Sequence, residues 1–263
     1  MFIIWGTRNI RRHRGYVAEF CAICRGIRAF RVSDIKLAHH FFFIPFATVK
    51  TVSQMRTCTT CGQHAFPEAG TYDAFMQQAH ADINTLVRET NPTLVEVLAD
   101  RLALEDKAKQ SLDQLSPDER RKLLKEPFVE LSGQVAWRFA RGGLMGIIRA
   151  LPLVVALFLA CIWIVYSDET KGAMHALVVA SGVVAAVLFL VGVWWLATWK
   201  RRYMKKRIVP LLGQALAPLQ PTEAELAEIL HTLKTDGHKI GKKLKPQWII
   251  QAIAAGTLRA PQA

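Results

Sequence analysis

Two closely spaced pairs of cysteines constrain the folding of this chain more than any other feature of its sequence. The first pair is Cys21 and Cys24, the second is Cys58 and Cys61, and 33 residues separate the two pairs. Two thiolates with two residues between them can bind one metal ion from a tight turn, and two such turns complete a tetrahedral site of four sulfur atoms. We therefore predict that these four side chains hold one zinc ion.

Three other uses of the four cysteines compete with zinc. Disulfides need an oxidising compartment, and the cytoplasmic location predicted for this region denies them one. Iron in a rubredoxin-like centre uses a similar paired spacing, and the sequence leaves this metal open. A thioredoxin-like redox centre needs a βαβ context and a single pair of cysteines, so redox chemistry and disulfides are both less favoured than iron.

The residues around the cysteine pairs suit a metal knuckle. Gly26 and Gly62 follow the two pairs closely, and we expect both to adopt a positive φ where the chain turns. Four thiolates around Zn²⁺ carry a formal charge of about −2. Arg25, Arg28 and Arg56 are expected to offset this charge.

Residues 1–70 form a predicted β zinc ribbon. The segments 15–20, 27–32 and 51–57 alternate apolar and polar side chains or are rich in branched and aromatic ones, as short strands are. The apolar run at 40–49 is either a core strand of this unit or a surface that touches lipid headgroups. So small a domain has a small core, and the metal is expected to contribute much of its folding energy.

Two long apolar runs predict a membrane hairpin within residues 142–199. They cover about 144–166 and 173–199, and only the six residues 167–172 separate them. About 20 apolar residues in a helix cover the hydrocarbon core of a bilayer. Because the connection is so short, the two helices are expected to be antiparallel.

The basic residues beside the two runs predict the orientation of the hairpin. The whole chain carries 34 Lys and Arg against 21 Asp and Glu. Lys and Arg are dense outside the hairpin and sparse in its connecting loop, which places both termini in the cytoplasm at the inner membrane. The residues expected to contact anionic lipid headgroups are Lys200, Arg201, Arg202, Lys205, Lys206 and Arg207.

The remaining segments predict helices. Residues 71–141 are expected to form amphipathic cytoplasmic helices, with one apolar stripe running from Phe75 through Ala79 to Leu86. A capping box at Ser116 opens a second helix, and Pro127 is expected to end it.

Residues 200–263 are expected to be basic and helical. Thr222 and Glu225 form a second capping box, and Gly237 ends the helix that it opens. A short helix is expected over 246–256. The predicted fold class is therefore an α+β membrane protein with a β zinc ribbon, cytoplasmic helices, a transmembrane hairpin and a short C-terminal helical segment.

Several pieces of the sequence resemble a known group of proteins. FIIWGTRN, GYVAEFCAIC and CTTCG are similar to the zinc ribbon that begins a group of largely uncharacterised, membrane-anchored and mostly bacterial proteins. NPTLVEVLADRLALE, SPDERRKLLKEPF and PTEAELAEIL, with the hairpin between the last two, resemble the same architecture. The resemblance implies four metal ligands at Cys21, Cys24, Cys58 and Cys61, a ribbon used for structure or protein contact, and no reaction. Arg25 stands where many such knuckles carry Gly.

The functional hypothesis that follows is a non-enzymatic scaffold or adaptor that recruits an unknown protein partner to the inner leaflet. It depends on a closed metal site and on the absence of GxGxxG, GxxxxGK[ST], HExxH and GxSxG from the sequence. Binding of nucleic acid by the basic ends is the alternative, and electron transfer or thiol chemistry is a weaker third hypothesis. Two spans cannot enclose a wide pore, so a channel role would require an oligomer.

Overall fold

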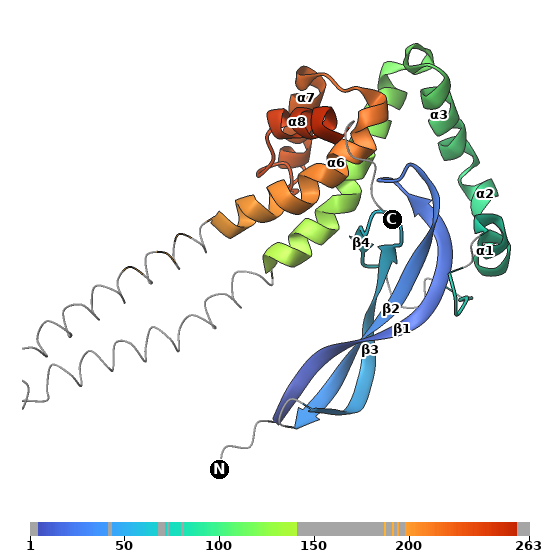
Figure 1. Cartoon of the computed structure of the whole chain (residues 1–263), viewed down its shortest axis with the longest axis vertical. Coiled ribbons are helices and arrows are strands. Elements are labelled where there is room, and N and C mark those ends of the chain that lie inside the picture. The colour runs from blue at the N-terminus through green and yellow to red at the C-terminus, as the bar shows by residue number, and fades with distance from the viewer. Residues whose placement is uncertain are drawn as a thin grey trace, which may run out of the picture. The chain divides into compact units, whose positions relative to one another are not determined.

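The protein is described by a computed structural model that combines a β-sheet with helices (Figure 1). The residues it describes are 5–41, 44–67, 72, 74–79, 82–140, 187, 191, 194 and 198–256. Two compact units emerge, the first formed by 1–135 with 207–263 and the second by 136–206.

Three long antiparallel strands form the sheet of the first unit. They are β1 (Trp5–Cys21), β2 (Gly26–Phe41) and β3 (Ile44–Cys58), and the short β4 (His64–Ala65) adds to β3 in the order β1-β2-β3-β4. Because β1 and β3 are both antiparallel to β2, they run in the same direction. The two strands therefore end at the same end of the sheet, where their last residues are Cys21 and Cys58.

The three predicted strand segments are present, and each strand is longer than its sequence pattern indicated. Residues 44–49 of the apolar run belong to β3, whereas Phe42 and Phe43 lie outside the described residues. The register of β1 shifts between His13 and Gly15, so Arg14 is an extra residue in this strand. Bulges of this kind increase the local twist, which Figure 1 shows along the ribbon.

Gly15 is needed because another segment passes very close to it. The Tyr16 N–H donates to the Met76 carbonyl over 2.7 Å, and the Met76 N–H donates back to the Tyr16 carbonyl over 3.0 Å. A Cβ on Gly15 would lie 2.6 Å from the Met76 oxygen, and φ at Gly15 is 155°. A residue without a side chain thus lets the segment around Met76 dock on the edge of β1.

Short helices cover one part of the sheet. They are α1 (Ile83–Thr90), α2 (Leu94–Val97) and α3 (Ala99–Gln110). Leu86, Val87 and Leu94 form a buried cluster with Ala18 of β1. The Thr90 hydroxyl also accepts a hydrogen bond from the Ala18 N–H at 3.0 Å.

The other helices of the first unit form a second apolar core. A short 3₁₀ turn, η1 (Leu112–Gln114), precedes these helices. The helices are residues 117–135 of a longer helix, α6 (Val209–Leu216), α7 (Glu223–Thr235) and α8 (Pro246–Gly256). A second 3₁₀ turn, η3 (Ala217–Leu219), follows α6. The fully buried side chains of these helices include Phe128, Leu131, Leu212 and Leu233.

Both capping boxes are confirmed. The Ser116 hydroxyl accepts from the Glu119 N–H at 3.2 Å, and Glu119 accepts from the Ser116 N–H at 2.9 Å. Thr222 and Glu225 make the same reciprocal pair at the start of α7, which ends just before Gly237. These caps depend on neighbouring residues alone, which is why the sequence predicts them well.

Two local predictions are wrong. Phe75 and Ala79 do not belong to a helix, because this segment bridges to β1 and α1 begins at Ile83. Pro127 does not end its helix, which continues to residue 140. Fully buried Phe128 and Leu131 follow the proline, and their packing outweighs the lost backbone hydrogen bond.

The second unit is described only in part. It includes residues 136–140, the helical residues 198–203 and the first residues of a π-helical turn, η2 (Met204–Ile208). The Phe139 ring contacts the rings of Trp199 and Tyr203 edge-on, at centroid distances of 5.6 and 6.3 Å.

The predicted fold class needs a correction. Within the described ranges, no helix combines the length and the apolar character that a bilayer crossing demands. This finding contradicts the predicted α+β membrane fold and the predicted multi-pass location in the inner membrane. The part of the predicted fold class that remains is a mixture of helices and β-sheet. The longest described helix, residues 117–140, carries charged side chains along its length, which a bilayer core disfavours. The predicted spans, 144–166 and 173–199, lie outside the described residues except at positions 187, 191, 194, 198 and 199.

Phe128 provides a test of the second apolar core. Its side chain is fully buried, so Phe128→Ala is expected to lower the free energy of unfolding by about 3–5 kcal/mol through lost burial and a cavity. Urea unfolding followed by circular dichroism measures this loss. Val129→Ala is the matched control, because Val129 is 44% exposed on the same helix. Equal losses in the two variants would contradict the packing described here.

Candidate metal centre

The four predicted cysteine ligands lie together at one end of the sheet. Their sulfur atoms all lie within 4.8 Å of one another, with Cys21 Sγ 3.6 Å from Cys61 Sγ and Cys24 Sγ 3.9 Å from Cys58 Sγ. All four are free thiols; Cys21 and Cys58 are buried, and the other two are half-buried. This cluster could hold a metal ion, as the sequence predicted.

The first knuckle, between β1 and β2, turns at Arg25. Arg25 has a φ of 53°, whereas Gly26 is not among the glycines with positive φ, so the expectation for Gly26 is wrong. The Cys24 N–H points back to Cys21 Sγ at 3.5 Å, as in metal knuckles. The residue that adopts the left-handed backbone conformation in this turn is therefore an arginine, although glycine adopts that conformation most readily.

The second knuckle, between β3 and β4, turns at Gly62, whose φ is 70°. The Gly62 N–H donates to the Cys58 carbonyl at 3.0 Å, and the Cys58 N–H donates to the Gln63 carbonyl at 2.9 Å. Thr59 joins this turn to β2, because its backbone N–H and its hydroxyl both donate to the Ala29 carbonyl. The expectation for Gly62 is confirmed.

The four thiols do not behave as independent acids. Hydrogen bonding with Cys24 and the other thiols, together with burial, raises the pKa of Cys21. Hydrogen bonding with Cys21 and the other thiols lowers the pKa of Cys58. Sulfur atoms this close can all be thiolates at once only when a cation balances their charge, so metal binding and proton release are linked.

The predicted role of the arginines as counter-charges is not what the structure shows. Arg25 pairs with Glu105 of α3, while Arg28 is exposed and donates to the Ile27 carbonyl. Arg56 pairs with Glu19 and Glu130. The half-buried guanidinium groups of Arg25 and Arg56 are thus neutralised by carboxylates, which the sequence pattern did not reveal because those partners lie far away along the chain.

Arg56 belongs to a polar cluster between the sheet and the helix that contains Glu130. The Tyr72 hydroxyl donates to Glu19 at 2.5 Å, and Gln63 donates to Glu130 at 2.9 Å. Burial raises the pKa of Tyr72. This cluster ties the residue after the second knuckle glycine to the helical part of the unit.

The histidines of the ribbon do not join the cysteines. Among the residues that the structure describes, the four thiols are the one group of three or more metal-binding side chains close enough to share an ion. His13 is exposed and contacts the Tyr16 ring, and His39 and His40 are half-buried. His64 Nδ1 lies 2.9 Å from the Thr57 hydroxyl, and burial, followed by the charge of Arg11, lowers its pKa.

The basic residues predicted to contact lipid lie on the helix around position 200 and in η2. Five of them are exposed and Arg202 is half-buried. The Lys200 ammonium lies 5.6 Å from the Phe139 ring centroid, and the Arg202 guanidinium lies 4.5 Å from that of Trp194. Lipid contact by these residues stays a prediction.

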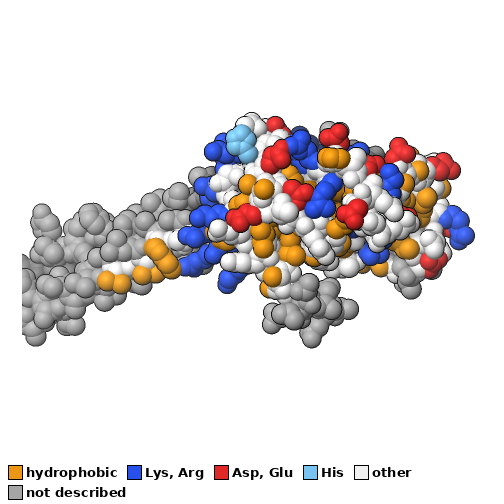
Figure 2. All heavy atoms as spheres, turned by 90° about the horizontal axis from the view of Figure 1, so that it is seen from above, with side chains coloured by type: hydrophobic (Ala, Val, Ile, Leu, Met, Phe, Trp, Pro, Cys, Tyr) orange, Lys and Arg blue, Asp and Glu red, His pale blue; other side chains and the backbone are white. Residues whose placement is uncertain are grey.

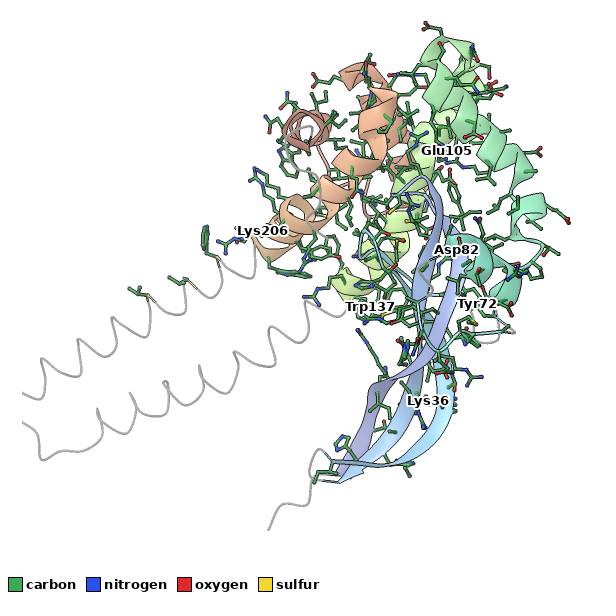
Figure 3. The ribbon with its side chains drawn as sticks, turned by 45° about the vertical axis from the view of Figure 1, so that its right-hand side comes forward. Lys36, Tyr72, Asp82, Glu105, Trp137 and Lys206 are labelled. Atoms are coloured by element: carbon green, nitrogen blue, oxygen red, sulfur yellow. The ribbon has the colours of Figure 1, made fainter. Side chains whose placement is uncertain are left out.

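Glu105 is the residue near the site that sequence reasoning missed. Its side chain accepts a hydrogen bond from Arg25 in the first knuckle, and the residue, which Figure 3 labels, is 1% exposed. On the sequence it is one acidic residue among many in 71–141, and charged residues are rarely fully buried. Because Glu105 and its partner Arg25 are 80 positions apart, no local sequence pattern indicates that Glu105 is buried.

Comparisons with models of protein families, with curated proteins and with solved structures found no match to this chain. The resemblance to membrane-anchored zinc-ribbon proteins therefore stays a prediction, and the site has to be interpreted from its own chemistry.

The two knuckle glycines give a matched test of the backbone geometry. Gly62→Ala is expected to lower the free energy of unfolding by about 1 kcal/mol, because alanine is strained at a positive φ. Gly26→Ala is expected to be neutral to within about 0.5 kcal/mol, because its φ is ordinary and no atom lies within 4 Å of an added Cβ. Thermal and urea unfolding measure both variants, and a larger loss at Gly26 would contradict the assigned turns.

Proposed function

We propose that the four cysteines bind one zinc ion and that the chain is a non-enzymatic adaptor that binds a protein partner. The observation that carries this proposal is the closed cluster of four sulfur atoms within 4.8 Å. Structural zinc sites have four protein ligands, whereas catalytic ones keep a position open for water or substrate. A site of this kind stabilises a fold rather than carrying out a reaction.

Zinc is preferred because it is redox-inert and adopts the tetrahedral geometry that two knuckles supply. Iron with four thiolates is the competing occupant. Zinc would be held by Cys21 and Cys24 from the first knuckle and by Cys58 and Cys61 from the second. It would join the ends of β1 and β3 at the place where the sheet meets the helices.

A groove between two helices supports protein binding. It has a volume of 380 Å³ and lies between the helix that starts at 117 and α7. Leu115, Leu124 and Ile229 line it, and the ion pair between Arg120 and Glu225 lies at its rim. Figure 2 shows acidic and basic side chains interspersed with apolar ones on the face of the molecule that it draws. An apolar floor with a charged rim is typical of protein interfaces.

The zinc part of the proposal is tested by metal analysis of the full chain. Wild-type protein is expected to contain one zinc per chain and to be colourless, and Cys58→Ser is expected to lose most of the metal. Cys161→Ser is the control, because this cysteine lies outside both closely spaced pairs in the sequence. A coloured, iron-containing protein, or a metal-free protein that keeps its fold, would overturn zinc binding.

The adaptor part is tested by quantitative crosslinking and affinity capture with the same three proteins. Wild type and Cys161→Ser are expected to recover a stoichiometric partner that Cys58→Ser fails to recover. Arg121→Glu, at an exposed position on the rim of the groove, is expected to weaken this capture without loss of zinc. If no stoichiometric partner is recovered by the wild type, the adaptor function is wrong.

Binding of nucleic acid is the second candidate, and one observation favours it. The part of the ribbon at 5–14 and 34–53 contains six basic residues against one acidic residue, Asp34. Arg11, Arg12 and Lys50 are exposed there, and Figure 3 shows Lys36 on the same part of the ribbon. Three paired strands with exposed basic side chains can follow a phosphate backbone.

This candidate predicts a salt-dependent association of the full chain with RNA or DNA oligonucleotides. Affinity is expected to fall steeply between about 50 and 200 mM salt, as counterion release requires. Arg11→Glu with Arg12→Glu is expected to weaken binding more than Arg121→Glu, which lies on the helix that starts at 117. Fluorescence anisotropy measures all three proteins, and the absence of binding by wild type at low salt would exclude the candidate.

A further inference from the structure

The first knuckle makes its left-handed turn at a residue that has a side chain. Arg25 has a φ of 53°, whereas Gly62 serves the corresponding turn of the second knuckle. A non-glycine residue in this conformation is strained and persists when surrounding contacts hold it there. The contacts of Arg25 therefore bear on the shape of the turn that presents Cys21 and Cys24.

Those contacts come from far along the chain. Arg25 Nε lies 2.7 Å from Glu105 Oε2, and Arg25 Nη2 lies 2.5 Å from the same oxygen. Arg25 Nη1 also donates to the Ala215 carbonyl of α6 at 3.4 Å. The side chains of Arg25 and Glu105 are 11% and 2% exposed. This ion pair is well shielded from solvent, and its geometry is directional.

The other side of the first knuckle is held from the same helix. The Arg101 guanidinium, one turn before Glu105 on α3, lies 4.8 Å from the ring centroid of Phe20, the residue that precedes Cys21. Arg101 Nη2 lies 2.6 Å from Glu105 and 2.6 Å from Glu126. Two side chains of α3 thus contact the residues on either side of the first cysteine pair.

We propose that Glu105 is a positioning residue of the metal centre, because it holds Arg25 in its left-handed conformation and so couples metal affinity to the docking of α3. This inference rests on the proposed zinc binding. Partners that orient the ligand shell commonly change metal affinity by about 10- to 100-fold. By linkage, the coupling is reciprocal, so the metal also stabilises the docked position of α3.

A double-mutant cycle on the full chain tests the coupling. The variants are Glu105→Gln, which keeps the size and removes the charge, Arg25→Gly, which removes the backbone strain, and the two combined. Arg25→Lys keeps the charge and the strain but loses the two-nitrogen contact with Glu105. Asp106→Asn is the control, because Asp106 is exposed on α3 and pairs with Lys109.

Zinc affinity is measured by competition with a chromophoric chelator, and the absorption spectrum of bound Co²⁺ reports the four-thiolate geometry. Glu105→Gln and Arg25→Lys are each expected to weaken zinc binding about 10-fold or more. Asp106→Asn is expected to bind as wild type does. In the Arg25→Gly background, Glu105→Gln is expected to cause no further loss, because glycine needs no partner to adopt a positive φ.

Hydrogen exchange gives a second readout that a purely local role of Glu105 would not change. Removal of zinc from wild type is expected to speed amide exchange in α3 more than in α7. In Glu105→Gln the exchange of α3 is expected to be fast already and to respond little to zinc. Equal responses of the two helices in wild type would overturn the coupling.

The outcomes separate this inference from the proposed function. If wild type fails to bind zinc, the proposed function fails and the inference falls with it. If wild type binds one zinc, and Glu105→Gln weakens binding equally in the wild-type and the Arg25→Gly backgrounds, only the inference is wrong. Should Glu105→Gln fail to fold, weaker zinc binding by Arg25→Gly than by Arg25→Lys overturns the inference.

Discussion

The approach of four sulfur atoms to within 4.8 Å of one another is the constraint on which this structure depends. It arises because β1 and β3 run in the same direction on either side of β2 and end at Cys21 and Cys58. Four thiolates at this spacing repel one another, and a cation between them removes the repulsion. A bound metal would therefore join two strand ends that are separated by a whole strand.

The helices are joined to this end of the sheet by partly buried ion pairs rather than by apolar contacts alone. Arg25 and Arg101 contact Glu105, and Arg56 contacts Glu19 and Glu130. Pairs that are shielded from solvent in this way cost desolvation energy, and they impose a particular geometry. In this chain they fix the geometry of the knuckles relative to α3 and to the helix that contains Glu130.

The predictions that succeeded concern short stretches of chain. Each of these features involves residues only a few positions apart, so local chemistry decides them. They are the turn that brings Cys21 and Cys24 together, the caps at Ser116 and Thr222, and the turn at Gly62. The predictions that failed needed information about distant partners. The segment around Phe75 docks on β1, and buried Phe128 carries its helix past Pro127.

By itself, the sequence determined the four cysteines of the cluster, the strands that lead to them and the ends of several helices, because spacing and side-chain type are sufficient for these features. Only the tertiary structure decided which residue of the first knuckle adopts a positive φ and which carboxylates pair with Arg25 and Arg56. It also overturned the membrane fold class, because no described helix has the length and composition to cross a bilayer. The physical reason is that burial of a charge is set by neighbours distant in sequence, and the chain pattern does not record them.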